Sequence, residues 1–476
     1  MAEVSTDSHE IAQLESAYAR LREAWSKEGA LPYKRRMAVL KALGKAVKAN
    51  QTAICEALNA DFGSRSTHET RLAEVWPLLM SIDHTRTHLQ DWMEPKVPEL
   101  TWHFQPASAR VVYQAKGVVG IIGPWNYPFQ LPMMGIVAAI GAGCRVLVRP
   151  SEVTPATGAL IARLVGEVFQ PGEVSVVNGG PAQAAAFSSL PLDHILFTGS
   201  TRVGKLVMKA AAENLTPVTL ELGGKSPAVI HPDFSLDTAA GRIAYGKLLN
   251  AGQTCIAPDY VLVHTSKVDA FCEAFGAAVR SCYPRLGDNP DYTAIINDHH
   301  YKRLSRQIDE ARDRGAKIIE INPASEVLDP ARRKIAPTLV VGAPADAECM
   351  TEEIFGPILP VVGVDSVEEA IAYINARPRP LALYYFDRSG RRVDHLLQHT
   401  LSGGVTVNDT MLHFTSEEMP FGGVGPSGMG AYHGLDGFRT FTHARAVFEQ
   451  SRINALSLFN PPYGKLMDAA LKLFNF

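Results

Sequence analysis

The sequence predicts an α/β protein whose parallel strands are covered by helices on both faces. Three observations indicate this class. Strand-like segments that are apolar on both faces alternate with helix-like segments between residues 118 and 220. A second alternating region follows from about residue 225 to 440. The length of 476 residues corresponds to two to four domains, at roughly 100–200 residues each.

The composition excludes several classes of protein. Lys and Arg number 46, Asp and Glu number 49, and a formal net charge of −3 excludes a nucleic-acid clamp or a polybasic membrane surface. Six cysteines are too few for a disulfide scaffold, and no two are spaced as CxxC, so we expect neither a zinc ribbon nor a dithiol redox centre. No metal-binding residues are expected. The most apolar stretch, Met133 to Cys144, is too short to span a bilayer. The polar, acidic N-terminus does not resemble a signal peptide, so we expect a cytoplasmic protein.

The first hundred residues are expected to be helical. Apolar residues recur at spacings of three and four in a first helix, where the stripe consists of Ile11, Leu14, Tyr18, Leu21 and Trp25. The same periodicity continues from about 37 to 58, and a third helix is expected from about 69 to 92.

The strands are expected in two sets. The first set lies at Val118–Ile122, Arg145–Val148, Val174–Val177, His194–Phe197 and Val218–Leu220. The second set lies at Tyr260–Val263, Pro337–Val341, Ile358–Val364, Ala382–Tyr385 and Gly404–Asn408.

Residues 99–116 have a different pattern. Leu100–Phe104 and Arg110–Gln114 flank the turn-like segment Gln105–Ser108, which predicts a β-hairpin. A protruding hairpin of this kind often serves assembly. One further strand is expected at Ala444–Phe448, and the tail from 456 to 476 contains a short amphipathic helix candidate.

Glycine-rich and polar segments follow the predicted strands, where parallel sheets bind ligands. Phe197–Gly204 leaves a strand and opens a helix. Gly199 permits a tight turn, Ser200 and the helix N-terminal amides face an incoming anion, and Gly204 lets the helix pack closely. Taken alone, this segment is more often a plain βα turn.

Four further segments carry polar groups with two interpretations each. Glu221, at a strand end before a Gly pair, is a cleft carboxylate or a capping residue. Cys255 lies among small polar residues, unlike a packed cysteine, and a thiolate there needs nearby amides or positive charge. Asn126 is either an oxyanion donor, since its side-chain amide has two N–H groups, or an ordinary turn residue. Glu353 and Phe355 lie in a loop folded over a ligand, or the acidic pair is merely solvated.

Together these segments resemble the aldehyde dehydrogenase superfamily. The matching segments, in the order typical of the family, are PWNYP at 124–128, FTGSTRVG at 197–204, LELGGKSP at 220–227, GQTCIAP at 252–258, EEIFGP at 352–357 and PFGGVGPSGMG at 420–430. GQTCIAPDY and SGMGAYHG resemble the class 3 branch, which includes fatty and aromatic aldehyde dehydrogenases. GKLLNAGQTCIAPDYVLV and RPRPLALYYFD resemble bacterial coniferyl aldehyde dehydrogenases most.

The resemblance implies a role for each matching residue. Cys255 would be the nucleophile, Glu221 the base that activates water, and Asn126 an oxyanion donor. The residues implied for cofactor binding are Trp125, Arg149, Ser151, Glu152, Gly199, Ser200, Gly204, Glu353 and Phe355. The residues implied for the mouth of the substrate pocket are Tyr127, Thr254, His413, Phe414 and Phe421. Arg149 stands where the family usually has Lys, so NAD is expected as the preferred cofactor with NADP usable.

The resemblance also implies the organisation of the chain. Residues 1–98 and 117–221 would bind NAD(P), and residues 222–441 would form the catalytic domain. Residues 99–116 and 442–453 would form a bridging β element that makes a homodimer, and residues 454–476 a C-terminal tail. The implied reaction is aldehyde oxidation, with a cinnamyl-type aldehyde such as coniferyl aldehyde as substrate. A medium- or long-chain fatty aldehyde is the alternative, followed by a CoA-acylating or a non-catalytic relative.

Overall fold

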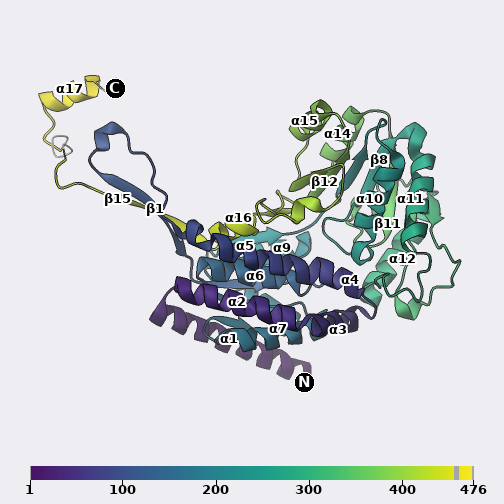
Figure 1. Cartoon of the computed structure of the whole chain (residues 1–476), viewed down its shortest axis with the longest axis horizontal. Coiled ribbons are helices and arrows are strands. Elements are labelled where there is room, and N and C mark those ends of the chain that lie inside the picture. The colour runs from purple at the N-terminus through teal and green to yellow at the C-terminus, as the bar shows by residue number, and fades with distance from the viewer. Residues whose placement is uncertain (1, 455–459, 474–476) are drawn as a thin grey trace.

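The computed structural model of the chain describes residues 2–454 and 460–473. Two helix-covered sheets lie next to each other, and a narrow two-stranded arm projects from the first of them (Figure 1). The largest apolar cluster contains residues of both sheets, for example Ile121 and Val261, so the two bodies share one core. Among the described residues, none of the helices has the length and apolar character needed to cross a membrane.

The N-terminal region is helical, as predicted. Its helices are α1 (Ala2–Glu28), α2 (Tyr33–Ala49), α3 (Gln51–Phe62), α4 (Thr67–Thr70) and α5 (Trp76–Met93), with a π-helical turn at Arg71–Val75. The pattern from 37 to 58 spans two helices, because Asn50 leaves helical geometry with φ −107° and ψ 19°.

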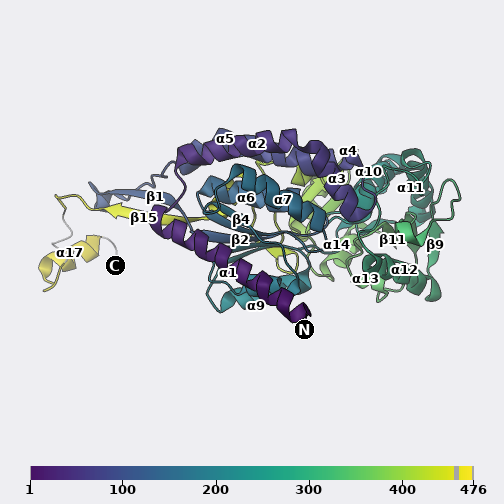
Figure 2. The same cartoon turned by 90° about the horizontal axis from the view of Figure 1, so that it is seen from below.

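The first sheet has six strands in the order β14-β6-β5-β2-β3-β4, and only β14 runs antiparallel. Its strands are β2 (Val118–Ile122), β3 (Arg145–Arg149), β4 (Val174–Val176), β5 (His194–Thr198), β6 (Val218–Glu221) and β14 (Gly428–Met429). Helices α6 (Gln130–Ala142) and α7 (Pro155–Val168) cover one face and carry α2 and α5 outside them, while α1, α8 (Pro181–Ser188) and α9 (Thr201–Ala212) cover the other (Figure 2).

The second sheet has seven strands in the order β13-β12-β7-β8-β11-β10-β9, and only β9 runs antiparallel. The strands are β7 (Pro227–Ile230), β8 (Tyr260–His264), β9 (Lys317–Glu320), β10 (Thr338–Val341), β11 (Ile358–Val364), β12 (Ala382–Phe386) and β13 (Gly404–Val407). The helices of this body are α10 (Leu236–Leu248), α11 (Val268–Cys282), α12 (Asp298–Asp313), α13 (Glu348–Thr351), α14 (Val367–Asn375) and α15 (Gly390–His399).

The predicted strands of both sets are present, which confirms the α/β class. The short strands β7, β9 and β14 were not predicted. The segment from 428 to 440 also differs from the predicted division of the chain: β14 pairs with β6, and α16 (Gly434–Thr440) packs on α5 and α6. Residues assigned to the second domain by sequence therefore join the first sheet.

The predicted hairpin at 99–116 is wrong. Residues Trp102–Phe104 form a 3₁₀ turn, and β1 (Ser108–Ala115) pairs antiparallel with β15 (Thr442–Glu449), more than three hundred residues later. Pro106 has no N–H for a ladder, so the segment before β1 is poorly suited to pair with it. The late strand itself is confirmed. It leads into the tail, where α17 (Lys465–Leu473) lies at the far end of the arm (Figure 1).

Candidate active site

The candidate site lies at the carboxyl ends of the first sheet. Arg149 ends β3, Ile122 ends β2 and Glu221 ends β6, and their strands are in parallel register across the sheet. The strand order reverses between β2 and β5, which is the point where open α/β sheets bind their ligands. The segments beginning at Gly123 and Gly199 leave the sheet on either side of this point.

The loop before Cys255 has an unusual backbone. Asn250 and Ala251 both adopt left-handed conformations, with φ 54° and 51°, and Gly252 follows at φ 77°. A Cβ at Gly252 would lie 2.3 Å from the carbonyl oxygen of Gly356, so only glycine lets this loop pass the 352–357 segment.

The buried side chain of Gln253 holds this loop in place. Its Nε2 donates to the backbone oxygens of Asn250 and Ala294, each at 3.0 Å, and its Oε1 accepts from the amide of Ile296 at 2.9 Å. All the polar atoms of this side chain are therefore used, and the position of Cys255 is set by a buried, satisfied amide.

Asn126 lies directly beside the cysteine loop. Its side-chain Nδ2 donates to the backbone oxygen of Gln253 at 3.1 Å. An amide nitrogen carries two hydrogens, so one remains for a ligand atom next to Cys255. The backbone oxygen of Asn126 accepts from Arg65 at 2.8 Å and from Asn250 at 3.0 Å, which fixes the residue from both sides.

Arg65 and Glu74 were not predicted from sequence, although they support Asn126. They form a fully buried ion pair at 3.0 Å, and Glu74 also accepts the amides of Phe129 and Gln130 at the start of α6. Burial raises the pKa of Glu74 to about 7, opposed by Arg65. Arg65 lies in the loop between α3 and α4, and Glu74 lies in the π-helical turn. Both are distant in sequence from the motifs, and no local pattern marks them.

Burial disfavours the charged forms of both Cys255 and Glu221. Glu221 is 2% exposed, and neither of its carboxylate oxygens has a hydrogen-bond partner. Burial alone raises its pKa well above the usual value. Burial, followed by the charges of Glu353 and Glu221, raises the pKa of the partly exposed Cys255 thiol to about 12. The turn after Glu221 contacts Glu353, whose Oε1 accepts from the amide of Gly224 at 3.1 Å, and the 352–357 segment passes the cysteine loop at Gly252.

The predicted pocket residues form two groups. Tyr127 and Thr254 share a hydrogen bond of 2.8 Å beside the cysteine. His413, Phe414 and Phe421 form an aromatic cluster, with His413 stacked on Phe421 at 6.0 Å between centroids and Phe414 edge-on to it at 4.9 Å. His413 was expected as a polar edge; its Nδ1 lies 2.9 Å from the hydroxyl of Thr406, and its Nε2 is buried without a partner.

Two residues of this aromatic cluster were missed. Tyr432 and His433 pack against Phe421, at 6.3 and 5.2 Å between centroids. The hydroxyl of Tyr432 and both ring nitrogens of His433 are buried without a hydrogen-bond partner. Burial raises the pKa of Tyr432 well above its usual value, and the residue lies three positions after β14, whose Gly428 pairs with Glu221. Both residues lie in the segment SGMGAYHG, and its resemblance to the family could have identified them from the sequence.

Arg149, the last residue of β3, has its guanidinium held by the residues around it. Its Nη2 lies 3.1 Å from Oε2 of Glu152 and 2.8 and 2.9 Å from the backbone oxygens of Gly179 and Gly180. Glu152 itself is half-exposed. The hydroxyl of Ser151 accepts from the amide of Val153 at 3.2 Å. The guanidinium is thus buried and engaged, while the carboxylate reaches solvent.

The turn after β5 fits an anion. Ser200 caps α9 by accepting from the amide of Val203, and the first turn of this 12-residue helix is open to solvent at the point where the strand order reverses. A Cβ at Gly199 would lie 2.6 Å from the ring of Phe197. At Gly204 it would lie 2.7 Å from Leu222, so Gly204 serves close packing of the helix, as predicted from the turn.

Glu353 and Phe355 lie in the 352–357 segment, and Phe355 contacts Trp125. Oε1 of Glu353 accepts from the amide of Gly224 at 3.1 Å, and burial raises the pKa of Glu353 to about 8. Phe355 has a left-handed φ of 52° and lies edge-on to Trp125 at 5.2 Å, while Trp125 also contacts His300 at 4.8 Å. This arrangement offers a carboxylate and an aromatic wall for a flat, polar ligand such as a nicotinamide riboside.

The fold and these groups define an α/β protein whose cysteine loop is held against the segment that follows β2. The profile of the Aldehyde dehydrogenase family matches residues 2–447, so the chain belongs to this family. It is accordingly an oxidoreductase that acts on aldehydes, in a family that uses NAD(P). The resemblance stated from sequence is confirmed.

Two relatives that the chain resembles over nearly its whole length are named for the same substrate. The chain is 48% identical over 475 residues to the probable coniferyl aldehyde dehydrogenase of Pseudomonas aeruginosa, covering 100% of this chain and 99% of the relative. It is 43% identical over 463 residues to the coniferyl aldehyde dehydrogenase of Pseudomonas sp., covering 97% and 96%. A solved structure of Staphylococcus aureus AldH in a substrate-bound state is 37% identical, with a TM-score of 0.91 over 97% of this chain and 99% of that one.

Proposed function

We propose that this enzyme oxidises cinnamyl-type aldehydes, such as coniferyl aldehyde, to carboxylic acids, with Cys255 as nucleophile and NAD as the preferred hydride acceptor. The observation that carries the proposal is the packing around the Cys255 loop: the Asn126 amide donates to Gln253, and the 352–357 segment joins the loop at Gly252 to the turn after the unpartnered Glu221. A nucleophile, an oxyanion donor and a base are the groups that covalent aldehyde oxidation requires.

In the first half of the reaction, the Cys255 thiolate attacks the aldehyde carbon to form a thiohemiacetal. The side-chain amide of Asn126 and the backbone amide of Cys255 stabilise the oxyanion, at about 2.7–4 kcal/mol per donor. When bound, NAD(P)⁺ supplies a positive ring that favours the thiolate and an acceptor for the hydride. Loss of the hydride from the thiohemiacetal carbon leaves a thioester on Cys255.

In the second half, water hydrolyses the thioester. Glu221 takes a proton from the attacking water, and the carbon–sulfur bond breaks to release the acid and regenerate the thiol. The apolar surroundings of Glu221 support this role, because they raise its pKa and make it a stronger base than an exposed carboxylate. A base at this position favours hydrolysis over transfer to CoA.

The groups after β3 support a preference for NAD. Glu152 would repel a 2′-phosphate and accept from a ribose hydroxyl, while Nη2 of Arg149 is engaged by Glu152 and two carbonyls. The turn at Gly199 and Ser200 would receive the pyrophosphate, and Glu353 would bind the nicotinamide ribose. NADP is then a usable but poorer cofactor.

The aromatic cluster supports a conjugated ring as substrate. His413, Phe414 and Phe421 offer faces and edges for offset stacking, which contributes about 0.5–1.5 kcal/mol beyond burial. The unpartnered hydroxyl of Tyr432 and nitrogens of His433 are buried polar groups, which could bond a phenol or methoxy group. The names of the relatives at 48% and 43% identity support the same substrate class. A fatty aldehyde is the alternative.

The test is a comparison of kcat/KM for coniferaldehyde, benzaldehyde, hexanal and decanal, each with NAD and with NADP. We expect coniferaldehyde with NAD to be best. Decanal exceeding coniferaldehyde tenfold or more would replace the aromatic assignment with a fatty-aldehyde enzyme. Cys255→Ala is the matched blank, expected to lose all oxidation while binding NAD nearly as the parent does. Activity above a few per cent in this variant would contradict the role of Cys255.

We also propose a homodimer assembled through the arm. Among the described residues, β15 pairs only with β1, whereas Val111 of β1 makes one isolated bridge to Lys96 on its other edge, so the outer edge of β15 is the one left free. Residence in the cytoplasm stays a prediction of the sequence.

A further inference from the structure

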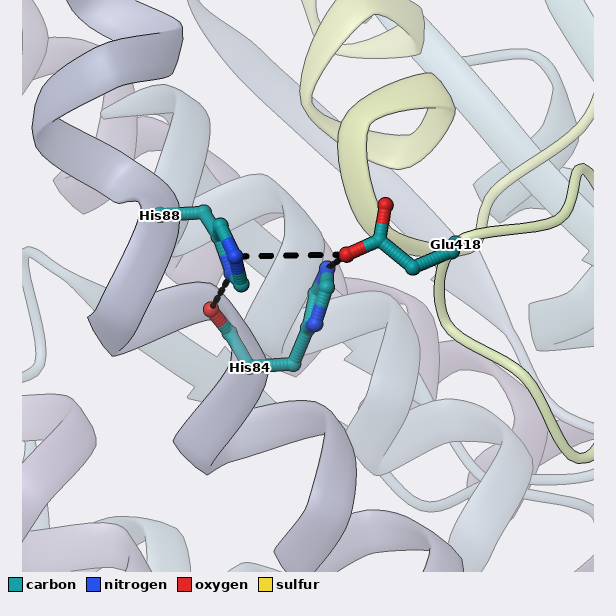
Figure 3. A group of neighbouring side chains, drawn as sticks. All are labelled: His84, His88 and Glu418. Atoms are coloured by element: carbon teal, nitrogen blue, oxygen red, sulfur yellow. Dashed lines mark hydrogen bonds and ion pairs between the residues drawn. The ribbon is translucent and has the colours of Figure 1, made fainter.

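A second cluster of possible ligands lies away from the cysteine, between α5 and the segment that precedes β14. His84 and His88 are one helical turn apart on α5, and Glu418 faces them from the other segment (Figure 3). Oε1 of Glu418 is 3.6 Å from Nε2 of His84 and 3.9 Å from Nε2 of His88. One nitrogen from each histidine and the carboxylate oxygen all lie within 4.8 Å of one another.

Both imidazole rings are oriented by their surroundings. Nδ1 of His88 lies 2.9 Å from the backbone oxygen of His84, so Nδ1–H donates and the lone pair of Nε2 faces the cluster. The two rings contact each other at 4.2 Å, and Trp92 packs against both, at 5.6 and 6.0 Å. This is the arrangement in which a histidine is held ready to bind a metal ion through Nε2.

We propose that His84, His88 and Glu418 bind a divalent transition-metal ion, with Zn²⁺ as the best match. Zinc takes imidazole nitrogens and carboxylate oxygens at about 2.0–2.2 Å in tetrahedral geometry, which sets neighbouring ligand atoms about 3.4 Å apart. The atoms here need only a small closing movement, and Glu418 is free to make it because its side chain is 73% exposed. Mg²⁺ and Ca²⁺ are excluded by the two nitrogen ligands.

The coordination is open on the solvent side. The side chain of His84 is 13% exposed and that of His88 is 37% exposed, so water can reach the fourth position. Three protein ligands and one water form a site that exchanges its ion with solution, unlike a closed structural site.

The bound ion would join two parts of the chain that already touch. Glu417, next to Glu418, accepts from the hydroxyl of Ser81 on α5 and from the amide of Gly434 at the start of α16, each at 3.2 Å. The metal adds a second connection between α5 and this segment. The same segment begins with the aromatic residues His413 and Phe414, so occupancy stabilises the region that carries the proposed substrate walls. The metal itself takes no part in the oxidation.

The chain contains a matched control for this geometry. His395 and His399 on α15 are also one turn apart, their rings lie 4.3 Å from each other, and Nδ1 of His399 is 2.7 Å from the backbone oxygen of His395. Glu368 lies 3.7 Å from His395, but the three groups do not converge within the distance that the first cluster meets. The control differs from the proposed site because its carboxylate forms an ion pair with only one of the two histidines.

The experiment uses tag-free full-length protein carrying Cys255→Ala, so that the reactive thiol cannot bind the probe, after dialysis against a chelator. ZnCl₂ is titrated by calorimetry, and CoCl₂ by the visible absorption of bound Co²⁺. We expect one equivalent bound and a higher Tm with Zn²⁺. His88→Ala and Glu418→Gln should each weaken binding at least tenfold and remove the rise in Tm, whereas His399→Ala should change neither.

The exposed positions of His88 and Glu418 make folded variants the expected result, and circular dichroism checks this. Absence of Zn²⁺ and Co²⁺ binding in the parent would overturn the proposal. So would equal affinity in the parent and a folded His88→Ala variant, because the ion would then be bound by other cysteines or histidines.

Discussion

The candidate active site and the arm differ in which side chains they bury and which they expose. At the centre, polar side chains are buried: Gln253 has all its polar atoms bonded, whereas Glu221 has none. On the arm, apolar side chains are exposed: Phe448 is 48% and Phe104 38% accessible, and their rings lie edge-on to each other at 5.9 Å between centroids.

The difference shows where each region obtains its stability. The centre is held from within, by the Arg65–Glu74 pair and by Gln253, so its unpartnered groups are kept in place to meet a ligand. The arm has only two strands, and a two-stranded sheet is marginally stable by itself. We therefore expect substitutions at the centre to change chemistry without changing assembly, and substitutions on the arm to do the reverse.

The largest effect is expected from Glu221→Gln. The amide cannot take a proton from water, so hydrolysis of the thioester should slow about 10²–10⁴-fold while acylation continues. Stopped-flow measurement should show a burst of about one equivalent of reduced cofactor per site and then slow turnover. Loss of the burst in folded protein would mean that Glu221 also serves acylation.

Asn126→Ala should have the next largest effect. Removal of one oxyanion donor lowers kcat about 10²–10³-fold. Steady-state kinetics with coniferaldehyde measures this, and light scattering should report unchanged assembly. An altered KM with an unchanged kcat would demote Asn126 to substrate positioning.

The arm is tested with Phe448→Glu. A charge on this exposed ring position should weaken the proposed dimer by about tenfold or more, because a charge buried at an interface is left without a partner. Light scattering at micromolar concentrations reports the assembly, and Leu215→Glu, at a 90% exposed position on the first body, is the control. A monomeric parent would contradict the dimer itself.

Glu152→Gln should change cofactor choice by a smaller factor. Removing the negative charge lessens repulsion of a 2′-phosphate and releases one contact of Arg149, so the ratio of kcat/KM for NADP over NAD should rise several-fold. A parent at least tenfold better with NADP would show that Arg149 outweighs Glu152.

The smallest effect is a pH-dependent change in stability. Burial raises the pKa of Glu221 in the folded protein, so the unfolded chain loses this proton first, near pH 4.5, and stability declines as the pH rises toward the folded pKa. Glu221→Gln lacks this loss. Its Tm should match that of the parent below pH 4.5 and exceed it at pH 8. Equal melting curves at both pH values would contradict the burial of an ionisable group.

The sequence by itself determined the α/β class, the strands of both predicted sets and the family. Strands that are apolar on both faces and motifs bounded by glycine can be recognised from a few neighbouring residues. A regular spacing of apolar residues is enough to predict a helix or a strand. They also placed Cys255, Glu221 and Asn126 at loop or strand ends, where the structure has them.

Only the tertiary structure decided which distant segments meet. The pairing of β1 with β15, the return of residues 428–440 to the first sheet, and the support of Asn126 by Arg65 join parts of the chain separated by 61 to more than 300 residues. The same holds for Glu418 beside His84 and His88. No periodicity carries such information, because these contacts depend on how whole layers pack around the shared core rather than on any residue's neighbours in sequence.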